Sequence, residues 1–139
     1  MSAAPGVTGL CPLVQVHDMA ASLEFYRDKV GFELVQHSAE IDAPEGRYFH
    51  WCLLKLGDAY LMLNTMYDAG ERPSERDHAR QSAHRDTALF FGCANADAVH
   101  AHLTAQGLDA PLPSMASYGL KGLSLRDPDG YEICFQESA

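Results

Sequence analysis

The sequence repeats one order of predicted elements in its two halves. In the first half, apolar residues predict a strand at 13–16, and helical spacing predicts a helix over 19–30 that a glycine ends. In the second half, a predicted strand at 88–91 is followed by a helix between Asn95 and Gly107. A repeat of this kind restricts the fold to architectures with two equivalent supersecondary units.

Each half also closes in the same way, on a hairpin. Gly57-Asp58 leads into a strand at 59–63, and Pro128-Asp129-Gly130 leads into a strand at 131–135. The remaining predicted strands are at 32–36, 48–56 and 119–126, with a weaker one at 112–115. The pattern predicts an α+β fold of two βαβββ modules within a single domain over 1–139, module one at 10–66 and module two at 87–137.

The segment between the modules, residues 67–86, is charged and contains proline and glycine. Its arginines are Arg72, Arg76, Arg80 and Arg85, and acidic residues lie between them. One interpretation is a lid that controls access to a ligand. The other, which we favour, is a solvated linker with a short helix near 75–82.

Charge and hydropathy exclude several classes of partner. The chain has 10 Lys and Arg against 19 Asp and Glu, and its net charge of −9 disfavours nucleic acid and anionic membranes. No apolar run approaches the ~20 residues of a membrane span, and there is no secretory signal pattern. The four cysteines contain no Cys-x-x-Cys pair, which favours reduced thiols in a cytoplasmic protein.

Several motifs resemble those of the vicinal oxygen chelate superfamily, which includes glyoxalases, bleomycin-resistance proteins and extradiol dioxygenases. The motifs are Val16-His17-Asp18-Met19, Ser22-Leu23-Glu24-Phe25-Tyr26, Gly31-Phe32-Glu33 and the closing segment 127–135. The resemblance covers nearly the whole chain. It implies a curved, eight-stranded cup with helices outside and a ligand or metal inside. It also implies a homodimer in which the cups are shared.

Strand alternation then predicts which residues face the cup. In module one, a two-residue turn pairs Lys55 with Tyr60, Leu53 with Met62 and Trp51 with Asn64. In module two, the same reasoning places Glu132, Cys134 and Gln136 inside, opposite Lys121, Leu123 and Leu125. The opening strands are expected to contribute Cys11, Leu13, Gln15, Ala88 and Phe90.

The metal enzymes of this superfamily take ligands from four inward positions, which by resemblance fall on Cys11, Met62, Ala88 (or Thr87) and Cys134. None of these is His, Asp or Glu. Glyoxalase I and extradiol dioxygenase chemistry need oxygen or nitrogen ligands, so we expect no such metal site. A soft-metal site or a disulfide between Cys11 and Cys134 remains open.

We therefore expect a pocket for an organic ligand, with no cofactor. Its predicted residues are Cys11, Gln15, Trp51, Tyr60, Met62, Asn64, Phe90, Lys121, Cys134 and Gln136. The favoured hypothesis is a metal-independent binding protein of the glyoxalase/bleomycin-resistance type. The alternative is a metal-independent lyase or isomerase, or else a metal-dependent one, with Glu132 or Lys121 as general acid or base.

Overall fold

The computed structural model describes residues 5–138. Module one contains six strands and one helical segment, in which the α-helix continues directly as a π-helix. In chain order the elements are β1 (Leu13–Val16), α1 (Met19–Leu23), η1 (Glu24–Val30), β2 (Glu33–His37), β3 (Ile41–Ala43), β4 (Gly46–Tyr48), β5 (Trp51–Leu56) and β6 (Ala59–Thr65).

Module two has four strands and one helix, and two short helices precede it. The elements are α2 (His78–Ala83), η2 (His84–Asp86), β7 (Ala88–Cys93), α3 (Ala96–Ala105), β8 (Ser114–Met115), β9 (Lys121–Arg126) and β10 (Glu132–Glu137). The short helix expected between the modules is confirmed as α2.

The strands of the two modules have the same order in space. The sheets are β1-β6-β5-β2 and β7-β10-β9-β8, and the opening strand is parallel to the closing strand in each. The α+β class and the two βαβββ modules are thus confirmed, with the eight strands divided between two four-stranded sheets. A further hairpin, β3–β4, was not predicted; it precedes β5 and shares only Tyr48 with the strand predicted at 48–56.

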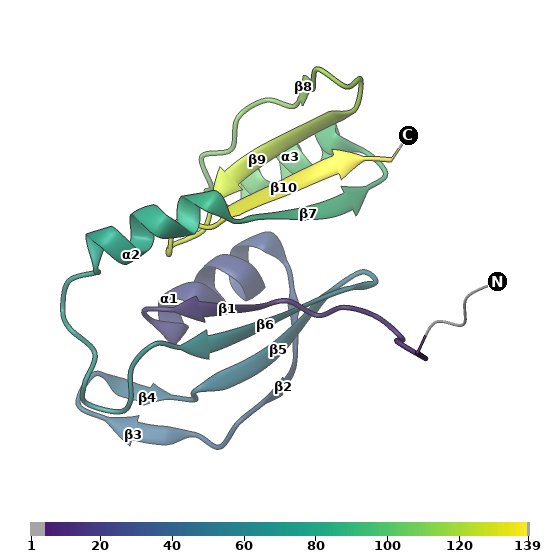
Figure 1. Ribbon diagram of the computed structural model, residues 1–139. Coiled ribbons are helices and arrows are strands. Elements are labelled where there is room, and N and C mark those ends of the chain that lie inside the picture. Colours follow the sequence, from purple (N-terminus) through teal and green to yellow (C-terminus); the bar gives the residue numbers. More distant parts are fainter. Residues whose placement is uncertain (1–4, 139) are drawn as a thin grey trace.

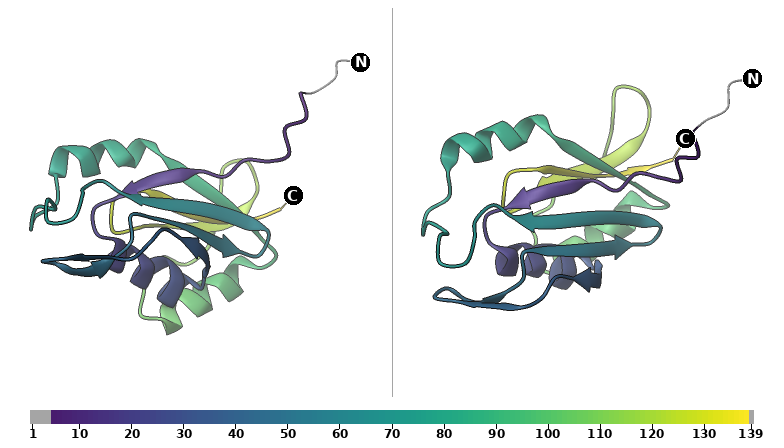
Figure 2. Two further views of the ribbon diagram at one scale, coloured as in Figure 1. Left: turned by 90° about the horizontal axis from the view of Figure 1, so that it is seen from below. Right: turned by 60° about the horizontal axis from the view of Figure 1, so that its bottom comes forward.

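The helices α1 and α3 lie on one side of both sheets. Figure 1 shows α1 and α3 behind the strands, and the views in Figure 2 agree. Leu61 and Leu63 of β6 point to the helix side and are fully buried, as is Ile133 of β10. The alternate residues of the same strands point away from the helices, so each sheet has an open face.

A turn over residues 127–131, here called the closing turn, joins module two to module one. One carboxylate oxygen of Asp127 accepts hydrogen bonds from the backbone N–H groups of Asp129 and Tyr131, both at 2.9 Å, and the other accepts from the Tyr26 hydroxyl. Asp129 accepts from the backbone N–H of His17 at 2.9 Å. Both carboxyl groups are buried, so the contact between the modules is polar and specific.

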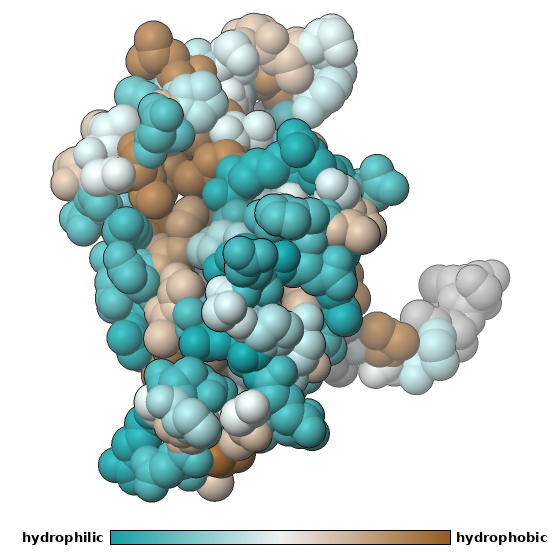
Figure 3. Space-filling view, turned by 90° about the vertical axis from the view of Figure 1, so that its left-hand side faces the viewer, coloured by the Kyte–Doolittle hydropathy of each residue, from teal (hydrophilic) through white to brown (hydrophobic). Residues whose placement is uncertain are grey.

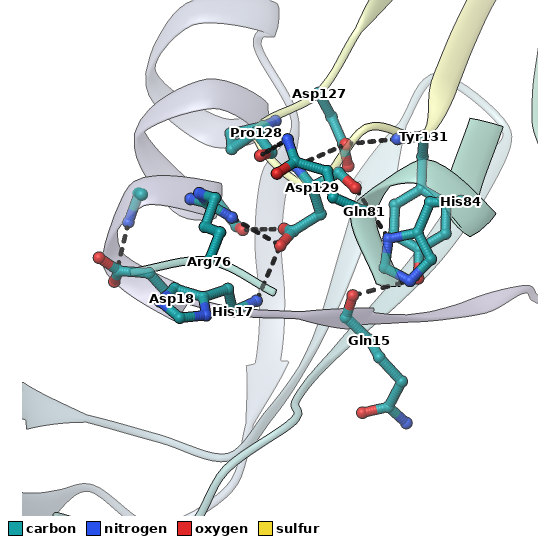
Figure 4. Close-up of polar contacts among 12 residues, drawn as sticks. Gln15, His17, Asp18, Arg76, Gln81, His84, Asp127, Pro128, Asp129 and Tyr131 are labelled. Atoms are coloured by element: carbon teal, nitrogen blue, oxygen red, sulfur yellow. Dashed lines mark hydrogen bonds and ion pairs between the residues drawn. The ribbon is translucent and has the colours of Figure 1, made fainter. Parts of the chain in front are cut away.

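An ion pair, a hydrogen bond and ring stacking connect the segment between the modules to this turn (Figure 4). Arg76 makes an ion pair of 2.7 Å with Asp129. The ring of His84 stacks on Tyr131 at 4.1 Å between centroids, and its Nδ1 bonds the Asp129 carbonyl. Residues 76–84 are therefore held against module two, while Arg72 makes an ion pair of 3.0 Å with Asp18 of module one, so the segment is not a free linker.

Candidate functional site

The open face of module one carries the side chains that alternation predicts. The pairs Lys55–Tyr60, Leu53–Met62 and Trp51–Asn64 are confirmed. On the neighbouring strand, Leu13 lies beside Met62 and Gln15 beside Asn64. The Asn64 amide donates a hydrogen bond of 3.2 Å to the Gln15 side chain. The face therefore combines apolar surface with a fixed pair of amides.

The open face of module two is covered in part by the loop 111–120, and the two enclose a cavity of about 250 Å³. The inward residues of β7 and β10 line it, namely Phe90, Glu132, Cys134 and Gln136. From the loop, the hydroxyl of Tyr118 accepts a hydrogen bond from the Gln136 amide. The cavity has an aromatic wall and a polar end, which suits a small organic molecule.

The prediction for β9 was wrong by one residue. A two-residue turn would have placed Lys121, Leu123 and Leu125 inward, but the strands are joined by five residues and Arg126 pairs with Glu132. The backbone bonds that Asp127 accepts make the turn longer. Because the loop is longer than predicted by an odd number of residues, every side chain of β9 lies on the opposite face of the sheet from the one predicted.

Lys121 consequently lies on the helix side, away from the cavity. Its ammonium group bonds Asp97 of α3 at 2.6 Å, and this hydrogen bond raises the pKa of Lys121. The open face of β9 instead presents Gly122, Ser124 and Arg126. Lys121 is therefore removed from the candidate acid–base groups.

Glu132 and Cys134 lie two residues apart on the same face of β10. The Cys134 thiol donates to the Glu132 carboxylate at 3.5 Å. Burial, and then the charge of Glu132, raise the pKa of Cys134 to about 11. At neutral pH this thiol is protonated and is a poor nucleophile and a poor metal ligand.

The residues at the four ligand positions of the family do not fit a hard divalent metal. Cys11 and Cys134 offer thiols, Met62 offers a thioether, and Ala88 offers no donor. Within residues 5–138, no group of three or more His, Cys, Asp or Glu side chains is placed to hold a metal ion. All four cysteines are free, so Cys11 and Cys134 do not form a disulfide.

The ten predicted ligand residues thus fall into three places. Module one carries Cys11, Gln15, Trp51, Tyr60, Met62 and Asn64, of which Cys11 lies two residues before the start of β1. Phe90, Cys134 and Gln136 line the cavity of module two, and Lys121 is elsewhere. Sequence reasoning missed the loop residues, such as Leu112 and Tyr118, because alternation does not apply outside strands.

A cavity of about 740 Å³ lies on the helix side between the modules and is mainly apolar. Val99 and Leu103 of α3 line it. Val99 and Leu103 lie four and eight residues after the N-cap of α3, and Ser22 and Tyr26 lie at the same positions after the N-cap of α1. In module one, the hydroxyl groups of Ser22 and Tyr26 donate hydrogen bonds to the closing turn. The cavity is therefore the counterpart of a polar contact that module two lacks the side chains to make.

No helix within residues 5–138 is long and apolar enough to cross a membrane.

None of the curated proteins matches the sequence significantly. Solved structures do match the fold. A bleomycin resistance determinant encoded on the transposon Tn5 has a TM-score of 0.69 at 16% identity, over 95% of this chain and 98% of that one.

Two other structures agree. A bleomycin-binding protein in complex with bleomycin has a TM-score of 0.69 at 16% identity, covering 96% of this chain and 100% of the other. A glyoxalase/bleomycin resistance protein from Catenulispora acidiphila has 0.62 at 21%, with the same coverage. The sequence profile of one family matches residues 10–135. The chain belongs to the Glyoxalase/Bleomycin resistance protein/Dioxygenase superfamily.

Proposed function

We propose that the protein binds a small organic molecule on the open faces of its two sheets, without a metal ion. The observation that carries this proposal is where the large exposed apolar side chains lie. Leu13, Tyr60 and Phe90 point from the open faces and are 44%, 41% and 60% exposed. Leu112, Met115 and Tyr118 of the covering loop are also exposed. Such apolar surface is typical of a binding site.

The composition of these faces favours a ligand that is flat or amphipathic. Trp51, Tyr60 and Phe90 provide aromatic surface, and Asn64 and Gln136 provide amide donors and acceptors. Two of the structures with this fold are named for bleomycin resistance or binding. Metal-free bleomycin is therefore a rational first probe, alongside other aromatic drugs and metabolites.

We further propose a homodimer in which open faces of two copies combine into shared cups. Among residues 5–138, neither module covers the open face of the other, since Tyr60 and Phe90 stay exposed, and a ligand held between two faces would lose more contact with water. A dimer would also bury the apolar side chains that a monomer leaves exposed. Light scattering at several concentrations tests this, with Phe90→Asp expected to weaken the dimer and Ala101→Asp, at an exposed position of α3 on the helix side, as the control.

The contacts between the modules support the expectation that residues 1–139 form a single domain. The four free cysteines support a reducing compartment such as the cytoplasm. The net charge of −9 supports the expectation of neither nucleic acid nor membrane partners.

A thermal-shift screen tests the binding function. The purified protein is screened against metabolites and aromatic drugs, including bleomycin, with and without EDTA. We expect saturable stabilisation by at least one compound, unchanged by EDTA. Loss of stability on chelation, or stabilisation only after adding metal, would contradict metal independence.

A second candidate is a metal-independent lyase or isomerase, supported by the position of Glu132 in the cavity of module two. Its carboxylate lies beside Cys134 and within reach of a bound molecule. Mass spectrometry of each stabilising compound after incubation tests this. The enzyme is favoured if a compound is converted by the wild type, and if Glu132→Gln still binds that compound but no longer converts it. The binding protein is favoured if every compound is recovered unchanged.

A further inference from the structure

We infer that the protein has an oxyanion-binding site between α2–η2 and the closing turn, for a phosphate or carboxylate group. The site adjoins the open face of module two but uses residues outside the proposed ligand pocket, so its evidence is independent of the proposed function. A cavity of about 420 Å³ lies there, lined by His78, Gln81, Ser82, Arg85, Arg126, Asp127 and Gly130.

The residues from the helical side share one face. His78, Gln81, Ser82 and Arg85 follow the spacing i, i+3, i+4 and i+7, which brings their side chains to the same side of a helix. All four can donate hydrogen bonds, His78 when protonated or in the appropriate tautomer. The face of the molecule that carries α2 is largely hydrophilic, with hydrophobic residues gathered in its upper part (Figure 3).

The two arginines are free to bind an anion. Six of the ten Lys and Arg residues form ion pairs within the described part of the chain, but Arg85 and Arg126 do not. Arg126 donates one hydrogen bond, of 2.9 Å, to the Gly130 carbonyl, which fixes its direction and leaves other N–H groups available.

The single carboxyl group lining the cavity does not neutralise the arginines. Asp127 is buried, and its two oxygens already accept from Tyr26, Asp129 and Tyr131. Arg126 pairs across the hairpin with Glu132, yet these side chains make no ion pair within residues 5–138. The cavity therefore holds two unpaired guanidinium groups, which match the planar geometry of carboxylate and phosphate oxygens.

The experiment uses inorganic phosphate and, separately, acetate as probes on the full chain. Each is titrated against chloride at matched ionic strength while the melting temperature is recorded. The variants are Arg85→Gln and Arg126→Gln. The control is Arg80→Gln, because Arg80 also lacks an ion pair within the described residues but lines a different cavity, beside Asp129.

We expect saturable stabilisation of the wild type by at least one probe, and affinity at least about tenfold weaker in each of the two variants. Arg80→Gln should bind like the wild type. Amide NMR shifts of Ser82 and Gly130 during the wild-type titration give a readout that needs no variant. Stabilisation no greater than with chloride, equal loss in Arg80→Gln, or NMR shifts confined to other residues would overturn the site.

Discussion

Replacing Tyr26 with phenylalanine tests the contact between the modules. The substitution removes one hydroxyl group and leaves the ring, which packs edge-on against Phe25 and Phe32, in place. Tyr26 is 0% exposed and Asp127 is 5% exposed, so water cannot replace the lost donor. A hydrogen bond to a buried charged group contributes about 1.5–3 kcal/mol. We therefore expect a loss of about 2 kcal/mol at pH 7.5.

The loss can be measured by urea and thermal unfolding. With an unfolding entropy of roughly 2.1 cal/mol/K per residue, about 2 kcal/mol corresponds to a fall of roughly 7 °C in Tm for a chain of this length. The hydroxyl stabilises the charged form of Asp127, whose pKa burial raises to about 6. Below pH 5 that carboxyl is mostly protonated, so the loss should become smaller.

Tyr48 provides a matched control. Its hydroxyl is buried and has no hydrogen-bond partner among the described residues. Tyr48→Phe should therefore leave stability unchanged or raise it slightly. The reasoning fails if Tyr26→Phe changes the free energy of unfolding by less than about 0.5 kcal/mol, or if Tyr48→Phe costs as much.

Three further predictions concern the closing turn and the cavity of module two. The pKa of Asp127, raised from 3.8 to about 6, favours its protonated form in the fold, so its contribution to stability is complete below pH 4 and is lost as pH rises through 6. The stability of the wild type relative to Asp127→Asn should then fall by roughly 2.4 kcal/mol between pH 4 and pH 8 in urea titrations, and a flat difference would refute it. The Cys134 thiol, with a pKa of about 11, should react with iodoacetamide at pH 8 on the order of 100-fold more slowly than a peptide thiol, as followed by mass spectrometry; an equal rate would refute its burial. Gly130→Ala should destabilise the fold by more than 1 kcal/mol, because its φ is +88° and the added methyl would lie 2.9 Å from the Gln81 carbonyl. Gly57→Ala, at φ +59° with open space around it, is the control and should cost less.

The fold could be predicted from the sequence because it depends on local patterns of apolar residues and turn residues, and these patterns occur in both halves of the chain. Turn chemistry and alternation were enough to place Tyr60, Met62 and Asn64 on one face of β6, because the turn before that strand has two residues. The same method failed at Lys121. There the Asp127 carboxylate binds two backbone N–H groups, and the turn becomes longer by an odd number of residues.

Other features depend on contacts between distant parts of the chain. Arg76 and Asp129 are 53 residues apart, and no local pattern links them. The docking of segment 67–86 therefore could not be predicted. Arg126 lines the proposed oxyanion site because of the corrected register of β9. Arg85 lines the same site because α2–η2 lies against the closing turn.

One measurement tests the central claim most directly, namely amide NMR mapping of the strongest stabilising compound from the thermal-shift screen, recorded in EDTA. The proposed function predicts saturable shifts at Tyr60, Met62 and Asn64 of module one and at Phe90 and Gln136 of module two. The claim would be contradicted if no compound stabilises the protein without added metal. It would equally be contradicted if the shifts are confined to the helix-side cavity around Val99 and Leu103.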